Sequence, residues 1–60
     1  MTDLDRFTEL MDDLGLKYAT KSVQVMGESY CTEIGIKHSM MLIVFVFDGD
    51  GSFVYMSVER

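Results

Sequence analysis

The stretch that decides the fold is Met40-Met-Leu-Ile-Val-Phe-Val-Phe47, which contains no polar side chain. Its β-branched and aromatic residues predict a strand, and it is far shorter than the roughly 20 residues of a transmembrane helix. Successive side chains of a strand point to opposite faces. One face therefore carries Met41, Ile43, Phe45 and Phe47, and the other carries Met40, Leu42, Val44 and Val46. A half-exposed antiparallel strand alternates polar with apolar residues, so this strand needs cover on both faces.

The residues that follow predict a hairpin. Asp48-Gly-Asp50-Gly51 is a strong turn signal, because glycine accepts positive φ and aspartate bonds its own turn. Ser52 to Val58 then forms a second apolar strand, with Phe53 and Tyr55 on one side and Val54, Met56 and Val58 on the other. A calcium loop also opens with this Asp-Gly pattern, but it needs about twelve residues ending in a glutamate. Here a strand restarts at Phe53, so the hairpin interpretation is favoured.

The residues before Met40 predict two further strands. Tyr30 to His38 alternates clearly, and a turn is expected around Ser39. Tyr18 to Met26 is the weakest predicted strand, and Gly27-Glu28-Ser29 is expected to turn the chain between the two. Because neighbouring strands are joined by short turns, we expect an antiparallel meander of three to four strands.

The first residues predict a helix over 2–14. Leu4, Phe7, Leu10, Met11 and Leu14 share one helical face. Thr2 or Asp3 caps the start, and Gly15 in a left-handed conformation ends the helix, with Leu16 folding back on Met11 in a Schellman motif. The expected fold is therefore α+β, a single domain over residues 1–60 with one N-terminal helix packed on the meander.

One short helix covers one face of such a sheet and leaves the second face in water. An uncovered apolar face of this size marks an interface, and a homodimer is the simplest arrangement that buries it. The predicted oligomer interface consists of Met40, Leu42, Val44, Val46, Val54, Met56 and Val58. Two alternatives remain: the segment Lys17–Met26 folds across this face within the chain, or the face is reserved for a different protein.

Composition limits the partners. Ten acidic residues against five basic ones give a net charge of −5, which argues against direct binding of nucleic acid or of anionic membranes. It suits a protein partner with a basic surface. Cys31 is the only cysteine, so a disulfide or a zinc site within one chain is excluded. The opening residues carry no signal-peptide pattern. Together with the lone cysteine, this favours a reducing cytoplasm.

Catalytic groups are not predicted to meet within one chain. His38 and Cys31 are the candidate base and nucleophile, but they are seven positions apart in one strand and point to opposite faces. We expect no enzymatic activity and no cofactor. A small enzyme would need a composite pocket at a dimer interface, and that remains the third hypothesis.

The acidic side of the helix is the most suggestive local feature. Opposite the apolar stripe lie four carboxylates, Asp5, Glu9, Asp12 and Asp13. Asp12 and Asp13 occupy the last turn, where the helix dipole disfavours anions by roughly 0.3–1 kcal/mol each. Residues that depart from such a local structural preference are enriched at functional sites. We therefore hypothesise that this face binds a basic surface of a partner, although a simply solvated face is the common explanation.

The C-terminal stretch Phe45-Val-Phe-Asp48-Gly-Asp50-Gly-Ser-Phe53-Val-Tyr-Met56-Ser-Val58 resembles the endings of short proteins encoded by phages and prophages of Gram-positive bacteria. Leu10-Met-Asp-Asp-Leu-Gly-Leu-Lys-Tyr18 is similar to their usual opening. The shared motifs are a hairpin and a capped helix, so no functional residue transfers. Some phage proteins of this size inhibit anti-phage defence, including homodimeric inhibitors of Hachiman-type systems. The resemblance implies a homodimeric inhibitor of a host protein in the bacterial cytoplasm. The alternative is a structural or accessory protein that docks its apolar sheet face on a larger assembly.

Overall fold

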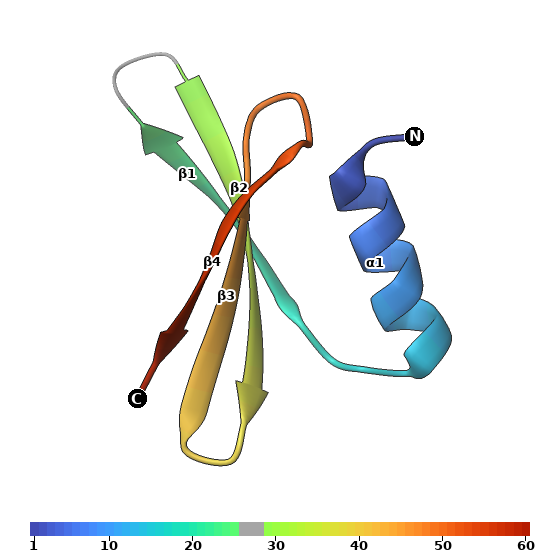
Figure 1. The fold of residues 1–60 in the computed structure, drawn as a ribbon, viewed down its shortest axis with the longest axis vertical. Coiled ribbons are helices and arrows are strands. Elements are labelled where there is room, and N and C mark those ends of the chain that lie inside the picture. Colours follow the sequence, from blue (N-terminus) through green and yellow to red (C-terminus); the bar gives the residue numbers. More distant parts are fainter. Residues whose placement is uncertain (26–28) are drawn as a thin grey trace.

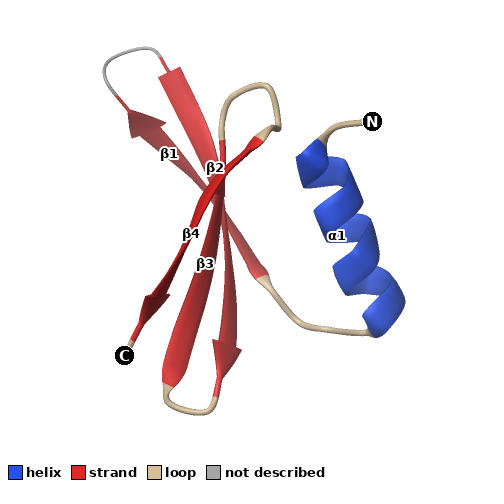
Figure 2. Ribbon diagram, in the orientation of Figure 1, coloured by secondary structure: helices blue, strands red, loops and turns tan. Residues whose placement is uncertain are grey.

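One helix and four strands make up the fold in the computed structural model, which describes residues 1–25 and 29–60 (Figures 1 and 2). The elements are α1 (Asp3–Leu14), β1 (Ala19–Val25), β2 (Ser29–His38), β3 (Met41–Phe47) and β4 (Phe53–Glu59). The strands pair antiparallel in the order β1-β2-β3-β4. The predicted α+β fold with a four-stranded meander is confirmed. The turn expected at residues 27–29 lies mostly outside the described residues.

Helix α1 begins and ends as its local sequence dictates. The Thr2 hydroxyl accepts the backbone N–H of Asp5 at 3.1 Å, and an Asp5 carboxylate oxygen accepts the N–H of Thr2 at 3.1 Å, which is a capping box. These hydrogen bonds lower the pKa of Asp5, the backbone N–H of Thr2 contributing most. At the other end Gly15 is left-handed (φ 71°), and the N–H of Leu16 donates to the carbonyl of Met11 at 2.9 Å. The predicted Schellman ending is therefore confirmed.

The turn between β3 and β4 is a type I turn closed by a left-handed glycine. The N–H of Gly51 donates to the carbonyl of Asp48 at 3.0 Å, and Gly51 has φ 84°. One carboxylate oxygen of Asp48 also accepts the N–H groups of Asp50 and Ser52, each at 2.9 Å. Asp48 therefore organises the turn through its own side chain, as the hairpin interpretation requires.

Two long-range hydrogen bonds fasten this turn to the start of α1, and we call them the clasp. The N–H of Leu4, one of the helix donors without an intrahelical partner, donates to the carbonyl of Gly51 at 2.8 Å. The Asp3 carboxylate accepts the N–H of Phe53 at 3.0 Å. Gly51 is buried, and a Cβ atom there would lie 2.7 Å from the Thr2 hydroxyl oxygen. The helix start thus packs directly on the hairpin turn.

The core lies between α1 and one face of the sheet, here called the helix face. The ring of Phe7 contacts the rings of Phe45 and Phe47, with centroids 4.5 and 5.5 Å apart. Phe47 and Ile34 are almost completely buried, and Met11 is buried on the helix side. Cross-strand partners share a face, so residues that pair with Phe45 and Phe47 belong to the helix face. The opposite side of the sheet is called the far face.

A register shift in β4 corrects one prediction. Phe47 pairs with Phe53, but Val46 pairs with Tyr55, because the register shifts between these pairs as at a β-bulge. Phe53 therefore belongs to the helix face and Tyr55 to the far face. The prediction that Phe53 and Tyr55 share one side is wrong, because it assumed a regular period of two through the whole strand.

Candidate functional site

The predicted oligomer interface does not form one face. Leu42, Val44 and Val46 belong to the far face, whereas Met56 pairs with Phe45 and Val58 pairs with Ile43 on the helix face. Val54 falls at the register shift and has no partner on β3. Met40 lies in the β2–β3 turn rather than in the strand, and its side chain is 90% exposed. The grouping of these seven residues on one face is therefore wrong, because the shift in β4 exchanges the faces.

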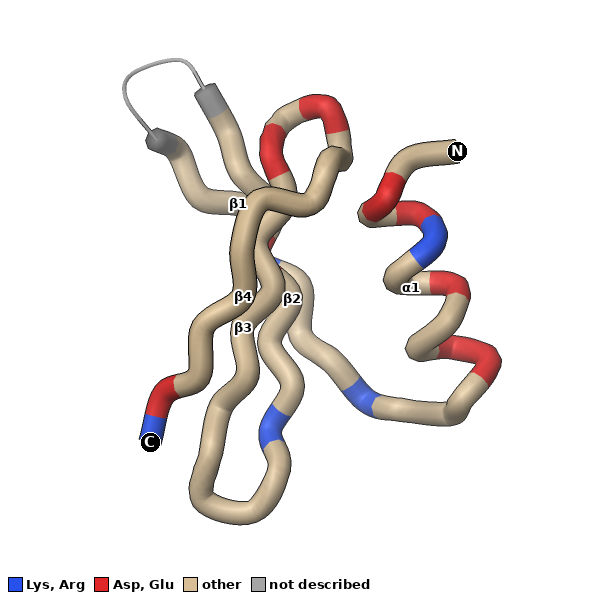
Figure 3. Tube along the Cα trace, viewed as in Figure 1, with Lys and Arg blue, Asp and Glu red and all other residues tan. Residues whose placement is uncertain are grey.

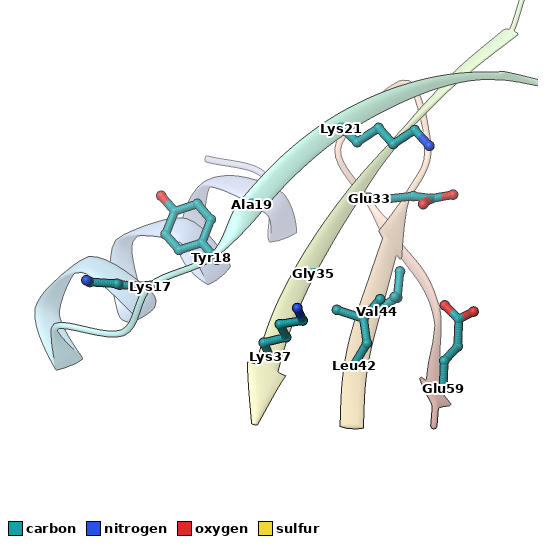
Figure 4. A pocket seen from close by; sticks show the side chains of 10 residues that line it. All are labelled: Lys17, Tyr18, Ala19, Lys21, Glu33, Gly35, Lys37, Leu42, Val44 and Glu59. Atoms are coloured by element: carbon teal, nitrogen blue, oxygen red, sulfur yellow. The ribbon is translucent and has the colours of Figure 1, made fainter. Parts of the chain in front are cut away.

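The far face of the central strand is mostly shielded by its own neighbours. Val44 and Val46 are only 8% and 6% exposed, and Leu42 is half-buried. A Cβ on Gly35 would lie 3.4 Å from a methyl of Leu42, so this side chain fills the space beside the glycine. Figure 4 shows four long charged side chains around Leu42 and Val44: Lys21, Glu33, Lys37 and Glu59. Long charged side chains commonly cover apolar surface with their aliphatic stems. The expectation of a broad uncovered apolar far face is therefore wrong.

The segment before β2, which was the alternative cover for the far face, does not lie across it. Residues Ala19–Val25 form the edge strand β1 and pair with β2, so they extend the sheet and do not cross it. What remains on the far face is a shallow depression of about 560 Å³, with Gly35 and Ala19 among its lining residues and Lys17, Lys21 and Lys37 among the charged ones. Two glutamates, Glu33 and Glu59, line it as well, so the charges largely offset one another.

Exposed apolar side chains gather instead on β4, and we call this set the β4 surface. Its members are each close to half exposed: Phe53, Val54, Tyr55, Met56 and Val58. A groove of about 330 Å³ adjoins it between α1 and the sheet, lined by Phe7, Leu10, Phe45, Phe47 and Phe53, with Asp3 and Arg6 at its rim. Leu10 is 50% exposed beside this groove. Sequence reasoning placed Leu10 and Phe53 in no interface, because both belong to regular apolar patterns.

The four carboxylates of the predicted acidic face are all exposed, but they differ in role. Figure 3 shows acidic residues along the whole length of α1. Asp5 belongs to the capping box, and an Asp12 oxygen accepts the Tyr18 hydroxyl at 3.3 Å. Glu9 and Asp13 make no hydrogen bond or ion pair with any residue that the structure describes. These two carboxylates lie one helical turn apart on the same side of α1.

Tyr18 links the acidic helix to the start of the sheet. It is half-buried and precedes β1 directly. Desolvation raises the pKa of its phenol, and the nearby charge of Asp12 together with the hydrogen bond to that carboxylate raises it further. The protonated phenol is thereby favoured as the donor to Asp12. This contact occupies one oxygen of the Asp12 carboxylate.

The candidate catalytic pair is separated in the structure. His38 pairs with Met41 on the helix face, and Cys31 pairs with Val23 on the far face, so the predicted separation is confirmed. Within residues 1–25 and 29–60, no three His, Cys, Asp or Glu side chains are grouped as a metal site would require. Over the same residues, no helix has the length and apolar character needed to span a membrane.

Comparisons of the chain with protein-family models, with curated proteins and with solved structures found no match in any of the three.

Proposed function

We propose that the chain is a non-enzymatic protein-binding module that works as a homodimer in the cytoplasm of a bacterial host and inhibits a host protein with a basic surface. The observation that carries this proposal is the β4 surface, where Phe53, Tyr55 and Met56 are each about half exposed on a strand with an open edge. These side chains lie on both faces of the edge strand, and several exposed apolar side chains on one edge of a small domain are characteristic of a protein interface. The resemblance to phage and prophage proteins supports a defence protein as the target.

The acidic helix supports the proposed binding of a host protein with a basic surface. The net charge of −5 favours a basic partner, and Glu9 and Asp13 project from α1 without partners among the described residues. Asp13 stands in the last helical turn, where a carboxylate costs roughly 0.3–1 kcal/mol through the helix dipole. A binding role accounts for a carboxylate that the fold itself does not need.

Capture from bacterial lysate tests this function when it is compared across matched variants. The immobilised protein, the Glu9→Lys/Asp13→Lys variant and an Asp50→Lys control are exposed to the same lysate, and retained proteins are quantified by mass spectrometry. Asp50 is exposed in the β3–β4 turn, away from the acidic residues of the helix body. We expect the double reversal to weaken retention of the target at least about tenfold, equivalent to ~1.4 kcal/mol, while Asp50→Lys retains it.

The double reversal separates binding from folding. Lysine at position 13 lies at the negative end of the helix dipole and should stabilise α1 slightly. A loss of capture with unchanged or higher thermal stability therefore identifies a binding role. Retention of the same proteins at the same level by the wild type and the double variant would refute the acidic face as the binding site.

A further inference from the structure

The two edges of the sheet differ in how they are protected. An edge strand presents unpaired N–H and C=O groups, and soluble proteins usually block such an edge with charge, lysine above all. Strand β1 carries Lys21 together with three exposed polar residues, Thr20, Ser22 and Gln24. Strand β4 has no proline, and its one charged residue is Glu59 at its last position, so Phe53 to Val58 carry no charge. Lys21 lies in the middle of β1, so the β4 edge is less protected against pairing than the β1 edge.

The apolar area on this edge is close to what a dimer needs. The five side chains of the β4 surface are between 48% and 53% exposed. At ~150–250 Å² for a fully exposed aromatic side chain, and less for methionine and valine, they offer at most roughly 400–600 Å² per chain. Two copies offer at most roughly 800–1,200 Å², and a specific interface buries about 1,200–2,000 Å² in total. Leu10 is 50% exposed and lines the groove together with Phe53, so it adds to this area, which then approaches the lower end of that range.

We propose that β4 pairs antiparallel with β4 of a second copy about a twofold axis, so that two four-stranded sheets become one continuous sheet. This deepens the proposed function, on whose homodimer it rests. A second copy fits because antiparallel pairing of a strand with itself places each face next to the same face. With Met56 at the twofold axis, the Met56 side chains of the two copies meet on the helix face. The uncharged run Phe53–Val58 also lets two chains of net charge −5 approach without opposed charges at the axis.

A charge placed at the axis tests this pairing. Met56 is 51% exposed, so Met56→Lys leaves no buried cavity, and its pairing partner Phe45 remains in place. The twofold axis brings the two new ammonium groups close together, which opposes association. Ser22→Lys is the matched control, because Ser22 is exposed on the helix face of the other edge strand, opposite Thr32.

Sedimentation equilibrium over a dilution series gives the oligomeric state of each protein. We expect the wild type and Ser22→Lys to form dimers of twice the 6.9 kDa chain mass, and Met56→Lys to dissociate with a Kd raised at least about 30-fold, or ~2 kcal/mol. Far-UV circular dichroism confirms that each variant is folded. Amide hydrogen exchange on the wild type supplies a second measurement: β4 amides should be protected in the dimer, and β1 amides that face solvent should not.

Each contrary outcome is distinct. A wild-type dimer that Met56→Lys leaves intact, with unprotected β4 amides, would refute the edge pairing and leave the homodimer of the proposed function standing on another surface. A wild type that stays monomeric at the highest soluble concentration would overturn both the pairing and the homodimer. Capture of a host protein by the acidic helix is a separate measurement, and neither result contradicts it.

Discussion

Replacement of Gly51 by alanine tests how the helix start and the hairpin turn depend on each other. The new Cβ would lie 2.7 Å from the Thr2 hydroxyl oxygen and 2.8 Å from the Thr2 Cβ, and Gly51 has φ 84°. The left-handed conformation costs an alanine about 1–2 kcal/mol. Moving Thr2 costs about 1 kcal/mol, the usual loss for an N-cap. Disturbing the hydrogen bond from Leu4 to Gly51 costs a further ~0.5–1.5 kcal/mol.

The expected loss for Gly51→Ala is therefore roughly 2.5–4.5 kcal/mol. A chain of 60 residues has a total stability of roughly 3–9 kcal/mol at ~0.05–0.15 kcal/mol per residue. The substitution thus removes a large share of the stability. Urea unfolding followed by far-UV circular dichroism measures it. Protein concentration is held fixed, because dimer formation adds to apparent stability.

Two further variants decide whether the clash with Thr2 is the cause. Gly15 also has positive φ (71°), but nothing lies within 4 Å of a Cβ placed there, so Gly15→Ala should cost only the ~1–2 kcal/mol of left-handed strain. Thr2→Gly removes the colliding atoms. In that background Gly51→Ala should also cost about 1–2 kcal/mol. Equal losses for Gly15→Ala and Gly51→Ala, or no rescue by Thr2→Gly, would refute the reasoning.

Three further measurements probe the same contacts. Phe7→Ala removes the ring that contacts two phenylalanines of β3. Because Phe7 is half-buried, we expect the free energy of unfolding to fall by about 2–3 kcal/mol, less than the ~3–5 kcal/mol of a fully buried ring. A fall of less than ~1 kcal/mol would contradict this packing. Asp48→Ala removes two turn hydrogen bonds and should cost about 1–3 kcal/mol in the same urea assay; an unchanged midpoint would contradict its role. The raised pKa of Tyr18 contributes stability that is full below the phenol's ordinary pKa of 10 and is lost as pH rises through the folded value. Tyr18→Phe should therefore remove a late step from the ultraviolet titration of tyrosinate; a titration curve of unchanged shape would contradict that shift.

Local signals account for the parts of the fold that were predicted correctly. Both ends of α1 are determined within a few residues, by Thr2 with Asp5 and by Gly15 with Leu16. The β3–β4 turn is likewise determined by Asp48 and Gly51. In each case the hydrogen bonds that satisfy the backbone come from the same short stretch, so the sequence alone contains the information.

The candidate interface could not be predicted in the same way, because it depends on contacts between distant residues. The register shift opposite Val46 and Phe47 moves Met56 and Val58 to the helix face. The sequence of β4 contains no glycine or turn motif that would predict this shift. On the far face, Leu42 fills the space beside Gly35, the residue that pairs with the buried Val44. A face count along one strand ignores both effects. It therefore assigned the exposed apolar area to the wrong side of the sheet.

The position of the β4 surface follows from how α1 is held. The clasp fixes the helix start beside the first residue of β4, through Leu4 to Gly51 and Asp3 to Phe53. The helix end leads through Gly15 into β1, the opposite edge of the sheet. The helix has 12 residues and is about 18 Å long, and Figure 1 shows the end of β4 running away from it. Met56 and Val58 lie on the helix face but beyond the cover of the helix, and this leaves the exposed apolar edge on which the proposed dimer depends.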